Sequence, residues 1–471
     1  MTFARPRRLF LSPLAATAVA ACIGLPAAAQ TIDDAFVSAY RTNPQLLSAR
    51  AQLRALDEGV PQALSGWRPT VSVGGSVGKA ADTNRRRTDL NSTAIQDVNR
   101  TPDSANIIVT QPLYRGGQTV ASVSQAENSV QAGRATLHSV EQQVLLQTAT
   151  AFANLARDKA TLDLAINNVQ VLARQLEETR GQREIGVVTA TDVAQAESRL
   201  EQARAAQIQA EGNLASSRAA YENVVGQAAP ANPAPAHLPP VLPNGSGELE
   251  AGILANPDVT AARFNEKAAA DAVDVLLGQK LPTVNLNGVV QRNTETDTRG
   301  VQQDNATVSL SVTFPLYQAG LTDAQTRAAK QTAGQRRIDI ETTRRQVLQA
   351  ALQNWSLFDA ARAQVQAFEV QVQSAQVAFN GVQAEQRVGT RTVQEVLNAQ
   401  QDLFSAQVNL VGAQRDNVVF SYQLASSLGG LTASQLALPV EIYDPVKNYR
   451  DTRERWFGTS IHEPAADTAG R

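Results

Sequence analysis

Residues 307–317 read TVSLSVTFPLY, and two features of this stretch decide the fold. Apolar and hydroxyl side chains alternate over the first eight positions, and the apolar side is formed by Val308, Leu310, Val312 and Phe314. A period of two with one apolar face predicts a half-buried β-strand. The closing Pro315-Leu316-Tyr317 repeats Pro112-Leu113-Tyr114, which lies 203 residues earlier. We therefore expect a strand that occurs once in each half of a duplicated chain.

The duplication extends over most of the chain. Matched positions are Asn43-Pro44 with Asn256-Pro257, Pro69-Thr70-Val71 with Pro282-Thr283-Val284, Val144 with Val347, Gly186 with Gly389, and Gly226 with Gly429. The offset falls from 213 to 203, so the first copy has ten extra residues between Pro69 and Pro112. This insertion contains Arg85-Arg86-Arg87, which we interpret as a solvated loop outside the cell or, alternatively, as a contact for lipopolysaccharide phosphates. Internal repeats of this kind indicate two copies of one structural unit.

The repeats divide the chain into five parts. Residues 1–29 have a positive start, an apolar stretch and the small-residue site Ala27-Ala28-Ala29, which together predict a secretory signal peptide. The first repeat covers 30–226, a Pro-rich linker covers 227–247, the second repeat covers 248–430, and a tail covers 431–471. We expect disorder at 463–471. Two other interpretations of the leader stay open, namely lipidation of Cys22 and a twin-arginine signal at Arg7-Arg8.

Each repeat is predicted to contain a helix, two strands and two long helices. The other strands lie near 70–77, 106–114 and 283–291, and each is about the 9–11 residues that a tilted strand needs to cross a bilayer. Ordinary soluble hairpins would show the same alternation. The helices carry sustained heptads, such as Phe358, Val365, Val372 and Phe379. Seven-residue spacing predicts left-handed coiled coils, and residues 118–180 contain no Pro, so this helix could run about 90 Å.

Composition excludes several classes of protein. A single cysteine excludes a disulfide scaffold and a multi-cysteine metal site. The formal net charge of −2 argues against nucleic acid as a main partner. Aromatic residues make up only 5% of the chain, which is unusual for a large layered core. We find no catalytic cluster, cofactor site or metal site, and we expect that the protein is not an enzyme.

Four strands per chain are too few to close a β-barrel, and open strand edges are not tolerated in lipid. Several chains must therefore share one barrel if the strands cross a membrane. An exported protein with short alternating strands and no apolar stretch of transmembrane length points to a bacterial outer membrane. The long helices would then project into the periplasm. The main alternative is a soluble periplasmic coiled-coil adaptor or structural protein.

Over residues 31–430 the chain resembles the TolC family of outer-membrane channel-tunnels. The resemblance rests on the duplication, the two Asn-Pro pairs, the strand endings QPLYRGG at 111–117 and FPLYQAG at 314–320, the turns at 185–186 and 388–391, and Leu428-Gly429. It implies an α+β membrane protein, in which a homotrimer forms a 12-stranded β-barrel continuous with a 12-helix coiled-coil α-barrel. It also implies an exit duct for proteins and small toxic compounds. The expected partners are a periplasmic adaptor, an inner-membrane ABC or RND-type pump, and outer-membrane lipid.

The resemblance further implies a gate at the periplasmic tip, where Gly186 and Gly389 interrupt the coiled coils. Arg391 matches the family's latch arginine, and Thr191 and Asp192 match its partners. The family's tyrosine, which would contact Asp192, is Gln386 here, so this link is expected to be weaker or differently made. The alternative is that these are ordinary exposed side chains.

Two positions match the acidic rings of the family's pore constriction. Glu395 keeps the charge of the first ring, whereas Asn398 removes the charge of the second. A carboxylate repeated three times around a narrow pore attracts cations and repels anions. Glu395 is therefore the candidate selectivity residue, and a solvated surface acid is the alternative.

Overall fold

The computed structural model describes residues 30–89, 92–240 and 252–461. The signal peptide, the end of the linker and the disorder predicted at 463–471 lie outside these residues. The first half contains α1 (Ile32–Thr42), α2 (Pro44–Asp57), α3 (Gly59–Leu64), η1 (Ser65–Trp67), β1 (Thr70–Val77), β2 (Ala80–Asp89), β3 (Ser92–Arg100), β4 (Asp103–Arg115), α4 (Gln118–Glu184) and α5 (Ala190–Val225). The second half contains α7 (Pro257–Gly278), β5 (Thr283–Thr294), β6 (Gln302–Thr313), α8 (Leu321–Arg387) and α9 (Val393–Ser427), and α10 (Lys447–Thr452) lies in the tail.

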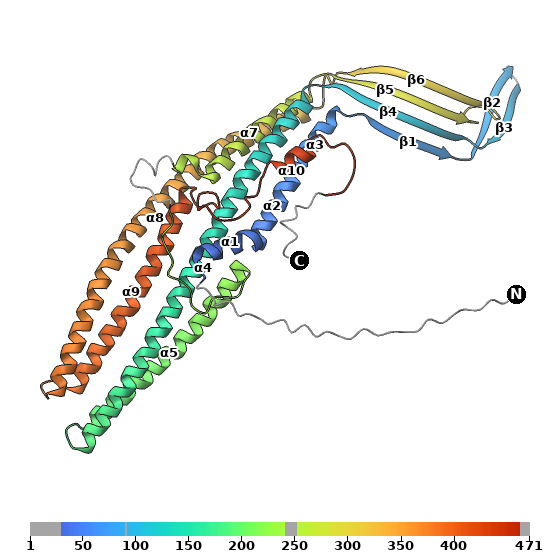
Figure 1. The fold of residues 1–471 in the computed structure, drawn as a ribbon. Coiled ribbons are helices and arrows are strands. Elements are labelled where there is room, and N and C mark those ends of the chain that lie inside the picture. The colour runs from blue at the N-terminus through green and yellow to red at the C-terminus, as the bar shows by residue number, and fades with distance from the viewer. Residues whose placement is uncertain (1–29, 90–91, 241–251, 462–471) are drawn as a thin grey trace, which may run out of the picture.

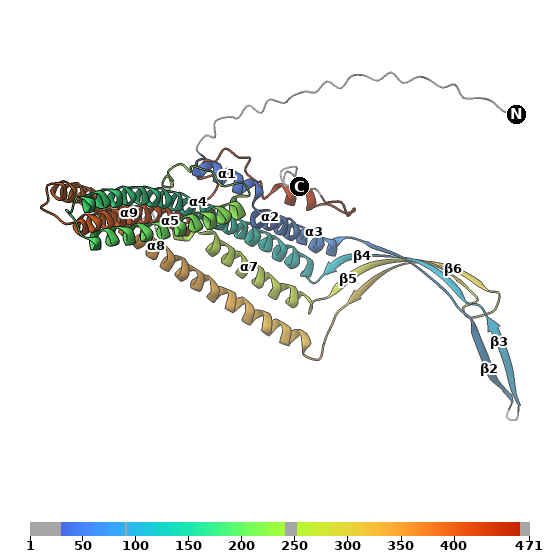
Figure 2. The ribbon, with the colours of Figure 1, turned by 90° about the horizontal axis from the view of Figure 1, so that it is seen from below.

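The molecule is long and thin, with a curved sheet at one end and paired helices at the other (Figures 1 and 2). Four strands form an antiparallel sheet in the order β1-β4-β5-β6, and they correspond to the four strands predicted from the sequence. The outer strands β1 and β6 each have one edge with no partner strand among the described residues. No helix in the described ranges is long and apolar enough to span a membrane.

The insertion in the first copy is a correction to the sequence analysis. It was expected to be a loop, but β2 and β3 pair as an antiparallel hairpin that extends beyond the sheet (Figure 1). The hydrophobic pattern could not predict it, because β2 from Asp82 to Asp89 contains no apolar residue and therefore has no apolar face. The hairpin continues the β1–β4 pair, since the Gly78 N–H bonds to the Pro102 carbonyl at 2.9 Å between them.

The register of the four-stranded sheet separates apolar from polar side chains. Val73, Ile107 and Val290 occupy one cross-strand row, and Leu286 and Leu310 face each other in a second. The opposite face is mostly polar, with rows that include Thr110, Asn287 and Ser309, or Asn285 and Ser311, while the row of Ser72 also contains Ile108 and Val289. A sheet with one apolar and one polar face has the alternation of a membrane barrel around a water-filled lumen.

The helical end consists of two antiparallel pairs, α4 with α5 and α8 with α9. Both α4 and α8 have 67 residues, which corresponds to about 100 Å of helix. The buried positions on α5 follow the predicted heptad, with Val193, Leu200, Leu214 and Tyr221 inside. Such spacing keeps one narrow stripe between the paired helices and leaves the remaining faces open.

The repeated Asn-Pro pairs explain how each half closes. The side-chain oxygen of Asn43 accepts from the Gln45 N–H at 2.9 Å and caps α2, while its amide donates to the Val224 carbonyl at 2.9 Å. Asn256 caps α7 in the same way and donates to the Ser427 carbonyl at 2.9 Å. In each repeat one asparagine side chain therefore caps the start of one helix and also bonds to a carbonyl at the end of the second long helix, α5 or α9.

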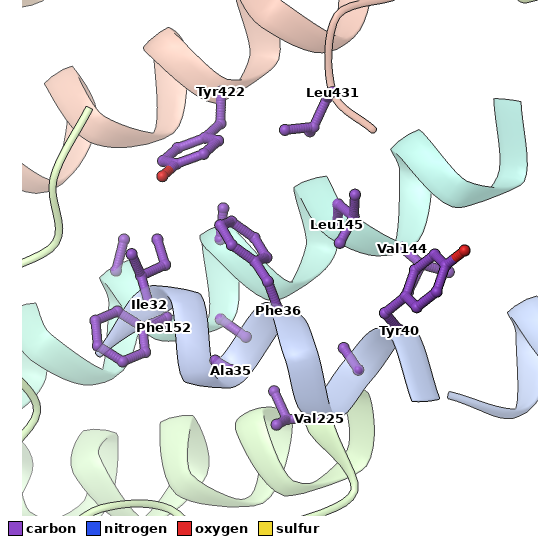
Figure 3. Close-up of a cluster of buried hydrophobic side chains, with 14 of the residues drawn as sticks. Ile32, Ala35, Phe36, Tyr40, Val144, Leu145, Phe152, Val225, Tyr422 and Leu431 are labelled. Carbon is purple, nitrogen blue, oxygen red and sulfur yellow. The ribbon is translucent and has the colours of Figure 1, made fainter. Parts of the chain in front are cut away.

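The main hydrophobic core lies at the middle of the molecule, where α1, α4, α5 and α9 meet the chain after α9 (Figure 3). Phe36 contacts Tyr422 edge to face with ring centroids 5.6 Å apart, and Phe152 packs near Tyr221. Five aromatic side chains, Phe36, Tyr40, Phe152, Tyr221 and Tyr422, are therefore buried together in this core, from which the helix pairs extend to the tips.

Candidate functional site: the helix tips and the gate

The two tips are built by equivalent turns. Gly186 and Gly389 adopt φ values of 79° and 83°, which disfavour any residue with a side chain. After each glycine the chain bonds back to its long helix, through Val187 N–H to the Gln182 carbonyl at 2.9 Å and Thr390 N–H to the Glu385 carbonyl at 3.0 Å. The glycines therefore reverse the chain within a few residues.

The second helix of each pair then begins with a capping box. Asp192 and Thr189 exchange bonds at the start of α5, and Glu395 and Thr392 do so at the start of α9. The bond from the Thr189 hydroxyl lowers the pKa of Asp192 below its ordinary value. Each cap satisfies backbone groups that would otherwise lack partners at the beginning of a helix.

An ion-pair cluster surrounds Arg391. Its Nε donates to Glu385 at 2.8 Å, and its Nη1 donates to Glu395 at 2.7 Å. The pKa of Glu395 falls from 4.5 to about 2, chiefly because its carboxylate accepts the Thr392 N–H and secondly because it accepts from Arg391. Two acids and one base give the cluster a net charge of −1 per chain at neutral pH.

Three predicted gate residues are not joined to Arg391 within one chain. Thr191 and Asp192 make no bond to it among the described residues, because the Asp192 carboxylate is used in the α5 cap. Gln386 does not contact Asp192 either, and its amide donates instead to Gln182 at 3.3 Å. Sequence comparison missed Glu385 as a partner of Arg391, although an acid six residues before an arginine across a tight turn is a signal that could have found it.

Polar bonds also link α9 to the other helix pair, and the sequence did not predict them. Arg199 on α5 donates to Asn398 at 3.2 Å, so the uncharged position of the second ring forms part of a link between the pairs. Further along, Gln400 donates to Asn168 at 2.9 Å and Arg415 donates to Asn154 at 2.7 Å.

A small apolar cluster joins the two pairs at the same level. Val393 and Leu397 of α9 pack among residues of α4 and α5, namely Leu172, Leu176, Val193, Ala196, Leu200 and Ala203. All eight side chains are buried. The tip of α8 and α9 is thus attached to the tip of α4 and α5 by one apolar contact with a few polar bonds around it.

The described residues include no group of three or more His, Cys, Asp or Glu side chains positioned to hold a metal ion. The charged side chains of Glu385, Arg391 and Glu395 are exposed and paired with one another. The arrangement suits a site that opens, closes and selects by charge.

Comparison with known proteins agrees with this architecture. The family model for outer membrane efflux proteins matches residues 36–227 and 251–430. The chain is 35% identical to the outer membrane efflux protein BepC of Brucella suis, over 92% of this chain and 93% of that protein. It is 25% identical to the outer membrane protein TolC of Vibrio cholerae, over 90% of this chain and 96% of that protein. The structure of the CmeC outer membrane channel of Campylobacter jejuni aligns with a TM-score of 0.75 at 14% identity, covering 90% of both chains.

The family match covers most of both repeats and all four long helices, and the sheet and helix pairs have the arrangement of the solved channels. The protein is therefore an outer-membrane channel and not an enzyme, and it extends into the periplasm. Each chain contributes four strands to a 12-stranded β-barrel that three chains share. This barrel is continuous with a helical barrel. The chain belongs to the outer membrane efflux protein family, and its fold is that of the trimeric TolC-type channels.

Proposed function

We propose that this channel is an exit duct gated at its helix tips, through which an inner-membrane pump and a periplasmic adaptor pass proteins or small toxic compounds to the outside. The observation that carries the proposal is the contact between the two helix pairs, where the cluster around Leu397 and the ions around Arg391 lie within a few residues of the turns. A tip attached by so small a contact can separate while the core at the middle stays packed.

The exposed surface of α8 supports a homotrimer. Large apolar side chains point away from the single chain along this helix, at Ile338, Leu348, Leu352, Val370 and Val377. Apolar stripes of this length on a soluble helix indicate a contact with another chain. The unpartnered edges of β1 and β6 require the same neighbour, since an open edge in lipid leaves backbone groups without bonds. The outward apolar face of the sheet then contacts outer-membrane lipid.

Charge at the tips supports cation selectivity. Within the ion-paired cluster each copy has Glu385 and Glu395 against one Arg391, so three copies of these paired groups give −3, and the exposed Arg387 lies outside these ion pairs. Removing Arg391 leaves two unpaired acids in each copy, or −6 in total, and the like charges would repel one another across a closed tip. In the proposed gate, one arginine per chain therefore partly neutralises the ring of negative charge and reduces the repulsion between chains.

The test is single-channel recording from trimers in planar bilayers. We expect Arg391→Ser to raise the closed-state conductance and Glu395→Gln to reduce the preference for cations. Glu385→Gln removes one carboxylate from the same cluster but leaves the capping residue in place, so a loss of cation preference in this variant as well would show that charge, and not the cap, sets the selectivity. A glutamine at 395 can still complete the capping box, so a change in selectivity would report charge and not unfolding. Unchanged conductance in Arg391→Ser would refute the latch, and equal selectivity in Glu395→Gln and the parent would refute the ring.

A further inference from the structure

The tail after α10 returns to the base of the barrel. Figures 1 and 2 both show it passing α3 toward the start of β1. Arg68, two residues before β1, holds it there: its Nη1 donates to the Arg455 carbonyl at 2.8 Å, and its guanidinium lies 4.9 Å from the centre of the Trp456 ring. The tail is therefore fixed at the level where the strands begin.

The segment from Arg455 to Ile461 is folded into a defined turn. The guanidinium of Arg455 donates to the Phe457 carbonyl at 3.3 Å, to the Ser460 carbonyl at 2.7 Å and to the Ser460 hydroxyl at 2.8 Å. Gly458 has a φ of 97°, which allows the sharp reversal between these bonds. The arginine thus closes the turn from inside and leaves its other face free.

That free face is apolar. Trp456 is 57% exposed, Phe457 is 85% exposed and Ile461 is 80% exposed. The two aromatic rings lie beside each other with centroids 6.4 Å apart, and neither belongs to an apolar cluster of the described residues. A turn held by four arginine bonds that presents large apolar groups outward has the form of a built contact surface.

We propose that this turn is a membrane anchor, in which Trp456 and Phe457 enter the headgroup region of the phospholipid leaflet around the base of the barrel. The occupant follows from continuity with the sheet. Val71 of the lipid-facing side lies three residues beyond Arg68, and the exposed Trp67 precedes it. Tyr114 and Phe314 are exposed at the same ends of β4 and β6. Aromatic residues gather at the membrane–water interface because one part of the ring system is apolar and another tolerates water.

The tail has no counterpart in the first repeat, so each chain supplies one such turn. A homotrimer would place three anchors around the barrel. They would fix the height and tilt of the channel relative to the membrane, at the point where the barrel meets the helices. This role is separate from the gate, which lies at the far end of the helices.

The test uses a full-length trimer in which each chain keeps a single tryptophan. The sequence has three tryptophans, and Trp67→Phe with Trp355→Phe leaves only Trp456. The trimer is reconstituted in vesicles of phosphatidylethanolamine and phosphatidylglycerol, with or without phospholipids brominated at a shallow or a deep position of the acyl chain. We expect bromine to reduce Trp456 emission, and the shallow bromine to reduce it more than the deep bromine.

Two matched proteins complete the experiment. A variant that keeps only Trp67 is the positive control beside β1, and one that keeps only Trp355 is the negative control, since it lies 34 residues into α8 or about 50 Å along the helix. Quenching of Trp456 similar to that of Trp67 supports the anchor. If bromine does not change the emission of Trp456, the membrane anchor is refuted. This holds also if the emission is blue-shifted, which would indicate that Trp456 is buried in a contact between chains. If the double variant does not form trimers, the difference in quenching between the parent and Trp456→Phe gives the same answer.

Discussion

The contact that holds the two tips together can be weakened at one residue without altering a charge. Leu397 on α9 is 2% exposed and packs in the cluster with side chains of α4 and α5. Leu397→Ala removes most of this side chain from the contact between the pairs and keeps a good helix former on α9. We expect the variant to shift the channel toward the open tip.

The size of the shift follows from the burial. Replacing a buried leucine by alanine costs about 2–5 kcal/mol. We take the lower value because the site lies near a helix end, and we assume that separation of the tips exposes half of the side chain. About 1 kcal/mol per chain then favours opening. Three chains that open together give about 3 kcal/mol, and a ratio changes tenfold for every 1.4 kcal/mol, so the open-to-closed ratio rises about 100-fold.

Single-channel recording measures this ratio directly as the fraction of time in the high-conductance state. Leu403→Ala is the matched control, because Leu403 is buried on the same helix but lies outside the cluster between the pairs. It should destabilise α9 without favouring the open tip. The reasoning fails if Leu397→Ala leaves the open fraction at the parent value, or if Leu403→Ala raises it equally.

Two further predictions concern the charge at the tips and the contact between chains. Because the pKa of Glu395 is lowered from 4.5 to about 2, its cap and ion pair should stabilise the tip fully above about pH 4.5 and lose effect as the pH falls toward 2. Conductance recorded between pH 7 and 4.5 should therefore stay constant, and a rise within this range would contradict the assignment. Ile338 is 69% exposed on α8, and Ile338→Asp should prevent trimers, as measured by light scattering of the purified protein. A stable trimer of this variant would exclude Ile338 from the contact between chains.

Much of the fold could be predicted because the same sequence patterns occur in both repeats. The strand alternation, the heptads and the paired glycines each occur in both halves, and chance patterns do not recur in the same order along a chain. The Asn-Pro pairs were visible as repeats in the sequence. The hydrogen bonds from Asn43 to Val224 and from Asn256 to Ser427 could not be predicted, because they join residues far apart in the chain. Only the folded chain shows which backbone carbonyl accepts from the side-chain amide of each asparagine.

The parts that could not be predicted have a common physical cause, which is that no apolar pattern marks them. The hairpin β2–β3 contains a polar strand, and the links of Asn398 with Arg199 and of Gln386 with Gln182 are polar pairs between helices that periodicity treats separately. The family pattern directed attention to Arg391, whose role as a latch stays a prediction. It could not supply the partner within the chain, because the capping box at Thr189 already uses the carboxylate of Asp192.

The distribution of contacts along α9 supports the proposed position of the gate at the tip. Near Val418 and Val419 this helix is part of the main core, together with α1, α4 and α5. Between that core and Val393 lie 25 residues, about 38 Å of helix, along which the links to α4 and α5 are separate polar bonds and one small cluster. Breaking these links costs little compared with breaking the core, so opening can begin at the turns and stop at the core. In the proposed gate, the main core would fix how far the opening extends, and the residues around Leu397 and Arg391 would set how readily it starts.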